Sequence, residues 1–163
     1  MWPHALLAAC GGFLIATLWF DLMFDTLVLG HAAAPVPLPD AVVAAIAAYY
    51  RRVTTEAHPM QQLIGAVMVV TVVVGGWDLR HRSYRVLRPT ALLASVVPIS
   101  LAAARVFPDA VQLGTGAGSQ AEQSALARGF LLAHVFCLGS ITTFTAIQVV
   151  LAGRWHRRNG SDR

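Results

Sequence analysis

The stretch ALLAACGGFLIATLWFDLMFDTLVL, residues 5–29, decides the fold class because it is one apolar run long enough to cross a membrane. A helix needs about 20 mostly apolar residues to span the hydrocarbon core of a bilayer. Two acidic residues lie inside this run, Asp21 and Asp25, and their spacing of one helical turn places them on the same face. The sequence therefore predicts a membrane helix that carries two carboxylates, whose purpose is the first question about function.

The composition also indicates a membrane protein. The chain has 163 residues, of which 56% are hydrophobic and 12% are charged, and its mean hydropathy is +0.61. A soluble domain usually has about 25% charged residues. The net charge of +4 comes from 12 arginines without any lysine. These arginines cluster at the ends of the apolar runs and not on a soluble face, so we do not expect nucleic-acid binding.

Three further runs are long enough to span, at residues 59–77, 89–107 and 121–152. Pro59 and Pro89 suit the first turn of a helix, and SQAE at residues 119–122 is a capping box at the start of the last run. We predict an all-α fold, a four-transmembrane-helix bundle that forms a single integral membrane domain over residues 1–163. Residues 153–163 form a basic tail.

A fifth helix is predicted at residues 40–57, where the apolar run is too short to span. Its apolar side chains fall on one helical face: Val42, Ile46, Tyr49 and Val53. We expect an amphipathic helix between the first two spans that lies on the membrane surface, with the rings of Tyr49 and Tyr50 at headgroup depth.

The arginines predict the orientation, because loops on the cytoplasmic side carry an excess of positive charge. Residues 78–88 and the tail together hold eight arginines and two aspartates, a net charge of +6, whereas the rest of the chain has a net charge of −2. We therefore expect a multi-pass protein of the cell membrane with both termini in the cytoplasm.

This topology gathers polar side chains in the outer half of the bundle. Asp21 and Asp25 reach that level on the first span, and the other spans bring further polar groups to it: His58, Gln61, Gln62, Arg105, Arg128 and His134. Charged groups at such depth usually face the interior of a bundle and pair with one another. We therefore expect a polar pocket that opens outward, with Asp21, Asp25, Gln61, Gln62, Arg105, Arg128 and His134 as its ligand-binding residues.

Three interpretations of these groups remain open. In the first, the aspartates form structural ion pairs with Arg105 or Arg128. In the second, the same charges hold the polar head of a lipophilic ligand such as a quinone, a lipid or a sterol-like molecule. In the third, a metal or catalytic site uses four carboxylate and imidazole groups: Asp21, Asp25, His58 and His134. No E-x-x-H or H-x-x-x-H pair supports this third interpretation.

The leading functional prediction is a small membrane accessory or structural subunit whose pocket binds a lipid-like or quinone-like ligand. The alternative is a membrane-bound oxidoreductase or oxygenase acting on a lipophilic substrate. There Asp21, Asp25 and His134 are the catalytic candidates, and Arg105 and Arg128 hold the polar group of the substrate. The expected partners are membrane lipids, a lipophilic small molecule and a second copy or a larger membrane complex. The sequence assigns no cofactor and leaves open whether the protein is an enzyme.

Three stretches carry a resemblance to known proteins: LWFDLMFD at residues 18–25, YYRRVTTEAHPMQQLI at 49–64 and RVFPDAVQLG at 105–114. They resemble a group of small, uncharacterised bacterial integral membrane proteins with four helices. The chain is also similar in architecture to the anthrone-oxygenase-like membrane proteins. The resemblance implies the four-helix fold and brings no activity with it.

Overall fold

The computed structural model describes residues 2–31, 37–81 and 84–160. The described residues form helices and no strand. Element bounds are α1 Trp2–Asp25 with the 3-10 turn η1 Thr26–His31, α2 Asp40–Thr55, α3 His58–Asp78, α4 Leu87–Leu101, the π-helical turn η2 Ala102–Val106, α5 Phe107–Thr115, and α6 Gln120–Gly160.

Four helical segments are long and apolar enough to cross a membrane, as in a multi-pass membrane protein: Pro3–His31, His58–Asp78, Leu87–Thr115 and Gln120–Arg154. This finding confirms the prediction of an all-helical chain with four such helices. The third segment reaches further than the predicted 89–107, because the helix continues through η2 and α5. Gly116 then ends it with a left-handed φ of 70°, a conformation that glycine adopts without steric cost.

The last helix is also longer than expected. It runs from Gln120 to Gly160, so the backbone of the basic tail predicted from residue 153 is helical to residue 160. Residues 161–163, which complete that tail, lie outside the described part of the chain.

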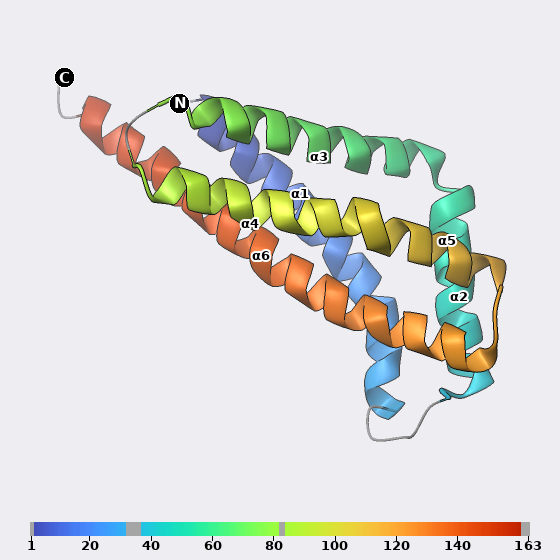
Figure 1. Cartoon of the computed structure of the whole chain (residues 1–163). Coiled ribbons are helices and arrows are strands. Elements are labelled where there is room, and N and C mark those ends of the chain that lie inside the picture. The colour runs from blue at the N-terminus through green and yellow to red at the C-terminus, as the bar shows by residue number, and fades with distance from the viewer. Residues whose placement is uncertain (1, 32–36, 82–83, 161–163) are drawn as a thin grey trace.

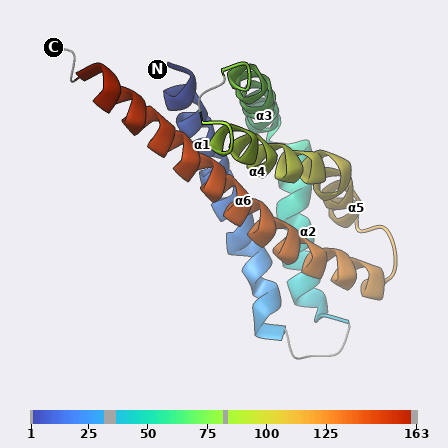
Figure 2. The same cartoon turned by 60° about the vertical axis from the view of Figure 1, so that its left-hand side comes forward.

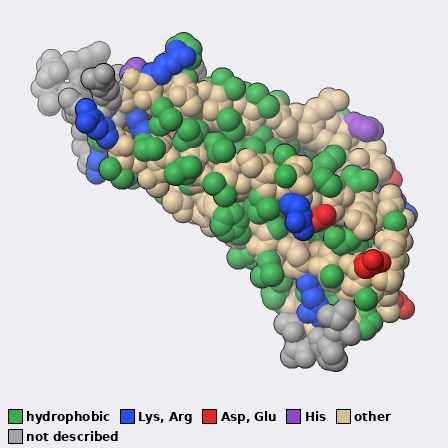
Figure 3. Space-filling model, viewed as in Figure 1, with side chains coloured by type: hydrophobic (Ala, Val, Ile, Leu, Met, Phe, Trp, Pro, Cys, Tyr) green, Lys and Arg blue, Asp and Glu red, His purple; other side chains and the backbone are tan. Residues whose placement is uncertain are grey.

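The long helices run side by side along the molecule, and α2 crosses one end of them (Figures 1 and 2). The start of α1, the turn between α3 and α4 and the final turns of α6 lie together at the opposite end (Figure 1). We call this the basic end, because arginine side chains gather there while hydrophobic side chains cover the middle of the visible surface (Figure 3). The end crossed by α2 is the distal end.

Helix α2 exists as predicted, but its buried face differs from the predicted one. The structure buries Val43, Ile46 and Tyr50, which join a hydrophobic core with Leu113 of α5 and Phe130 of α6. Tyr50 is only 3% exposed, so its ring lies inside the protein and not on the surface of the helix, while the headgroup depth expected for the two rings stays a prediction.

A close backbone contact accounts for the position of α2. A Cβ atom added to Gly114 of α5 would lie 3.0 Å from both the backbone nitrogen and the Cα atom of Arg51. Only glycine allows the two backbones to approach this closely. Helix α2 is thus packed against α5 by its backbone as well as by its apolar side chains.

A buried polar network at the basic end joins the four long helices. Arg88 of α4 donates from Nη1 to the Asp78 carboxylate of α3 at 2.5 Å, and His4 of α1 lies 3.9 Å from the same carboxylate oxygen. His4 also bonds the side-chain oxygen of Gln148 on α6 at 2.9 Å. All four side chains are at most 9% exposed. Sequence reasoning counted Asp78 and Arg88 only as charges outside the bundle and so missed this network.

Candidate functional site

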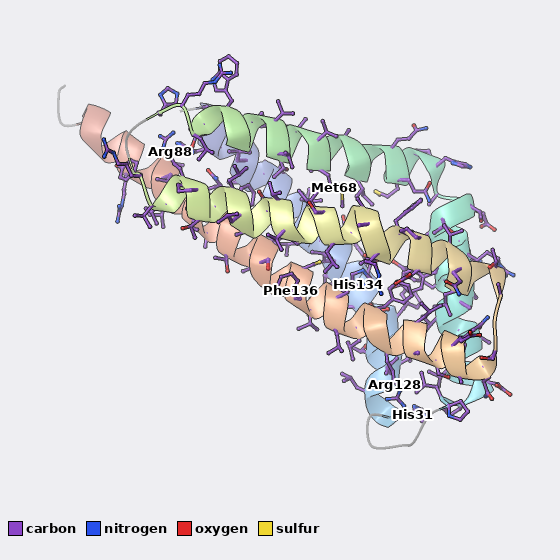
Figure 4. The ribbon with its side chains drawn as sticks, viewed as in Figure 1. His31, Met68, Arg88, Arg128, His134 and Phe136 are labelled. Atoms are coloured by element: carbon purple, nitrogen blue, oxygen red, sulfur yellow. The ribbon has the colours of Figure 1, made fainter. Side chains whose placement is uncertain are left out.

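The imidazole of His134 lies between the two aspartates that interrupt the first span. Its Nδ1 atom is 2.5 Å from Oδ2 of Asp25, and its Nε2 atom is 3.9 Å from Oδ2 of Asp21. The side chain of His134 points from α6 toward α1, inside the bundle (Figure 4). One turn separates the two aspartates on α1, so each carboxylate faces a different edge of the same ring.

Two adjacent tyrosines of α2 complete the arrangement. The hydroxyl of Tyr50 donates to Oδ1 of Asp25 at 2.8 Å, and the hydroxyl of Tyr49 donates to Oδ1 of Asp21 at 2.7 Å. The five side chains form one chain of polar contacts in the order Tyr49, Asp21, His134, Asp25, Tyr50. We call them the carboxylate–histidine cluster.

Aromatic packing holds these groups in place. The ring of Tyr50 stacks on Phe130 with centroids 4.4 Å apart, and Phe130 lies one turn before His134 on α6. On the other side, Tyr49 stacks on Phe24 of α1, with centroids 3.9 Å apart and planes only 12° from parallel. Each tyrosine hydroxyl is therefore aimed by a ring that cannot turn freely.

The cluster has a closed side and a more accessible side. Asp25 is fully buried and the side chain of His134 is 5% exposed, whereas the side chain of Asp21 is 17% exposed. Burial raises the pKa of both Tyr49 and Tyr50, and the neighbouring carboxylates raise it further. Both phenols therefore remain protonated donors at neutral pH.

A hollow of about 220 Å³ adjoins the accessible side; we call it the distal hollow. Its lining comes from α1 and α2: Phe24, Ala45, Ala48, Tyr49, Arg51, Arg52 and Glu56. Tyr49 both lines this hollow and bonds Asp21, so it connects the surface to the buried cluster.

The predicted arginine partners lie elsewhere. Arg105 is exposed, and its Nε atom is 3.9 Å from the carboxylate of Asp109 on the next turn. Arg128 donates from Nη2 to the backbone oxygen of His31 at 3.3 Å, at the far end of η1 (Figure 4). The expected ion pairs between the aspartates and these arginines are therefore replaced by contacts with histidine and tyrosine. The physical reason is that α2 lies across the distal end and places its phenols against the carboxylates.

The remaining predicted residues also lie apart from the cluster. Gln61 donates from Nε2 to the backbone oxygen of Val53 at 2.5 Å and so ties α3 to the end of α2. Gln62 is exposed, and so is His58, the first residue of α3. Of the predicted site residues, the structure brings together Asp21, Asp25 and His134.

A metal site of the predicted composition is not formed by these positions. Within residues 2–31, 37–81 and 84–160, no group of three or more histidine, cysteine, aspartate or glutamate side chains is arranged to hold a metal ion. His58, which the prediction included as a ligand, is exposed at the start of α3.

Sequence reasoning missed the two tyrosines as members of the site. A signal was present, since Val43, Ile46 and Tyr50 follow the i, i+3, i+7 spacing of a buried helix face as well as the chosen set does. Two faces of α2 were thus compatible with the pattern, and only packing against α5 and α6 selects between them.

Comparison with known proteins finds no matching family model, no matching curated protein and no matching solved structure.

Proposed function

We propose that the protein is a small multi-pass membrane subunit that binds the polar head of a quinone-like ligand at the Asp21 and Tyr49 side of the carboxylate–histidine cluster. The observation that carries the proposal is the series of polar contacts from the buried Asp25 through His134 and Asp21 to Tyr49 in the wall of the distal hollow. A quinone head has two oxygens that need hydrogen-bond partners, and a phenol beside a carboxylate supplies donor and acceptor groups together.

The shape of the distal hollow supports a flat head group. Phe24 and Tyr49 stand nearly parallel in its wall, and such rings favour stacking with a planar ligand. Pockets that enclose a whole drug-sized ligand are usually about 300–1,000 Å³. The distal hollow, at about 220 Å³, is large enough for a head group only. Phe20, one turn before Phe24, is 61% exposed and offers an apolar surface for the tail.

The proposal includes an orientation. We place the basic end and both termini on the cytoplasmic side of the cell membrane, because arginine is concentrated there. The cluster then lies in the outer half of the bundle, and the ligand enters from the outer leaflet.

Quenching of tryptophan fluorescence by a short-chain quinone tests the proposal. Trp19 of α1 is 62% exposed and lies close in sequence to Asp21, so a quinone bound there quenches it. We expect saturable quenching in detergent-solubilised protein. Tyr49→Phe and Asp21→Asn each remove part of the hydrogen-bonding group, and a bond to a charged partner contributes about 1.5–3 kcal/mol. The dissociation constant should therefore rise at least about tenfold in each variant.

Matched controls exist at other places in the chain. Tyr84→Phe removes a phenol at the basic end, and Asp109→Asn removes a half-buried carboxylate on α5. Neither should change the dissociation constant. Equal affinity in the cluster variants and the controls would show that the quinone only partitions into the apolar surface.

A second candidate function is a membrane-bound oxidoreductase, the alternative that the sequence raised. It is favoured by the same contact chain, because phenol, carboxylate and imidazole groups in series can move a proton to or from a bound head group. Tyr50→Phe distinguishes the two candidates, since Tyr50 lies at the buried end of the chain, away from the distal hollow. An oxidoreductase should lose turnover of a short-chain quinol in this variant while it keeps the affinity for the quinone, whereas a binding subunit shows no turnover in the parent protein.

A further inference from the structure

A second hollow, of about 380 Å³, lies at the basic end beside the turn between α3 and α4. We call it the basic hollow. Its lining combines three nitrogen-rich side chains with two apolar ones: Leu79, His81, Arg85, Arg88 and Pro89. It lies at the opposite end of the molecule from the carboxylate–histidine cluster, and nothing in the proposed function uses it.

Among the described residues, the lining of the basic hollow is positively charged, since it contains two arginines and a histidine but no acidic side chain. Asp78 is the only acidic residue between positions 77 and 90. Its carboxylate is 5% exposed and points inward to Arg88 and His4, so it does not face the hollow as a free negative charge. Arg85 and His81 are exposed, which leaves their donors available to an anion.

Another cation reaches the same turn from α6. The guanidinium carbon of Arg154 lies 5.7 Å from the centre of the Tyr84 ring, next to Arg85 in the chain. Two separate helical segments thus supply positive charge to one place, as a phosphate-binding surface requires.

The hollow lies where the headgroups of a bilayer would be. Trp77, at the end of α3, is 60% exposed, and the guanidinium carbon of Arg80 lies 4.1 Å from the centre of its ring. Exposed tryptophan and arginine at the end of a membrane helix are typical of the boundary between hydrocarbon and water. Leu79 and His81 follow within a few residues, so the hollow is at the level of lipid phosphates.

An apolar track leads from the hollow along α4. Pro89 lines the hollow, and Leu93 and Val97 follow at intervals of four residues, which places all three on one face of the helix. Leu93 is 63% exposed and Val97 is 48% exposed. A phosphate in the hollow therefore lies at the start of an exposed strip that an acyl chain can cover.

We infer that the basic hollow binds an anionic phospholipid, with its phosphate on Arg85 and His81 and one acyl chain along Pro89, Leu93 and Val97. Basic pockets at the ends of membrane helices attract anionic headgroups, and each arginine near the surface strengthens that attraction severalfold. The combination of a positively charged lining and an adjoining apolar strip selects a lipid with a net negative headgroup over a zwitterionic one.

Native mass spectrometry of the full chain, purified in detergent, tests this inference. Phosphatidylglycerol and phosphatidylcholine with identical acyl chains are titrated separately, and the fraction of protein with one bound lipid is measured. We expect tighter binding of phosphatidylglycerol by about tenfold or more. Arg85→Gln should lower that preference about fivefold, the contribution of one arginine. Arg105→Gln is the matched control, an exposed arginine at the other end of its span, and should leave the preference unchanged.

Two further measurements separate the sources of phosphate and the effects of folding. Inorganic phosphate at millimolar concentration should not displace the lipid, because it cannot use the apolar strip. The unfolding temperature of Arg85→Gln should equal that of Arg105→Gln, since both side chains are exposed. Equal binding of the two lipids, displacement by inorganic phosphate, or an equal loss of preference in both arginine variants would each overturn the inference.

Discussion

The contact between Asp25 and His134 gives the sharpest test of the carboxylate–histidine cluster. Asp25→Asn keeps the shape of the side chain and one oxygen that can still accept the bond from Tyr50, but it replaces the carboxylate oxygen nearest the imidazole with an amide nitrogen. Asp25 is fully buried and lies 2.5 Å from the imidazole, so water cannot replace the lost interaction. Leaving one partner of a buried hydrogen bond unsatisfied typically costs about 1–3 kcal/mol of unfolding free energy.

We expect the upper end of that range, about 3 kcal/mol, because both side chains are at most 5% exposed and water cannot reach them. For a chain of this length, each kcal/mol corresponds to about 2–4 °C, so the unfolding temperature should fall by roughly 6–12 °C. The assay is thermal unfolding of the detergent-solubilised protein. His134→Gln should cost a similar amount, and the double variant should lose much less than the sum of the two single losses, since both act on one contact.

The control is Asp109→Asn, which makes the same change in a partly exposed, loose pair with Arg105, 3.9 Å apart, and should cost at most about 1 kcal/mol. If Asp25→Asn costs no more than this control, or if the two cluster variants add independently, the contact does not stabilise the fold and the reasoning fails.

Three further predictions concern packing, the basic end and pH. A Cβ atom on Gly11 would lie 2.1 Å from Oγ1 of Thr145, whereas nothing lies within 4 Å of a Cβ atom on Gly12. Gly11→Ala should therefore lower the unfolding free energy by about 1–3 kcal/mol, measured by thermal unfolding. Gly12→Ala should be neutral or slightly stabilising. Asp78→Asn breaks the buried pair at the basic end and should cost about 3–5 kcal/mol by the same assay. Burial, with the nearby carboxylates, raises the pKa of Tyr50 above its ordinary value of 10.0, so the unfolded chain loses this proton first as the pH rises. The contribution of Tyr50 to stability should thus be constant below about pH 10 and fall above it, and Tyr50→Phe should reduce the alkaline slope by up to about 1.4 kcal/mol per pH unit.

Each of these has an outcome that contradicts it. Equal stability of the two glycine variants would show that α1 and α6 do not approach closely at that point. A loss below about 1 kcal/mol for Asp78→Asn would mean that the network at the basic end is solvated. An unchanged alkaline slope in Tyr50→Phe would mean that this phenol titrates in the folded protein as it does in the unfolded chain.

The order of residues is enough to assign which segments are helical and which are apolar enough to span. These properties are local: residues 5–29, 59–77 and 121–152 each contain a hydrophobic run that makes a helix long and apolar enough to span, whatever surrounds it. The common depth of Asp21, Asp25 and His134 also follows from counting residues along helices of fixed rise. For this reason the sequence alone predicts that these three side chains lie at one level of the bundle. The structure then brings the imidazole of His134 against both carboxylates.

The partners of those groups, in contrast, depend on packing between helices. The rotation of α2 against α5 and α6 determines which face of α2 is buried. It therefore also determines whether Tyr50 reaches Asp25. That rotation is set by close contacts such as the one between Gly114 and the backbone of Arg51, which are distant in sequence and leave no periodic pattern. The same holds at the basic end, where Asp78 faces inward rather than outward because α3 and α4 meet there. Helix periodicity fixes the relative positions of side chains on one helix, but tertiary packing fixes which side chains meet.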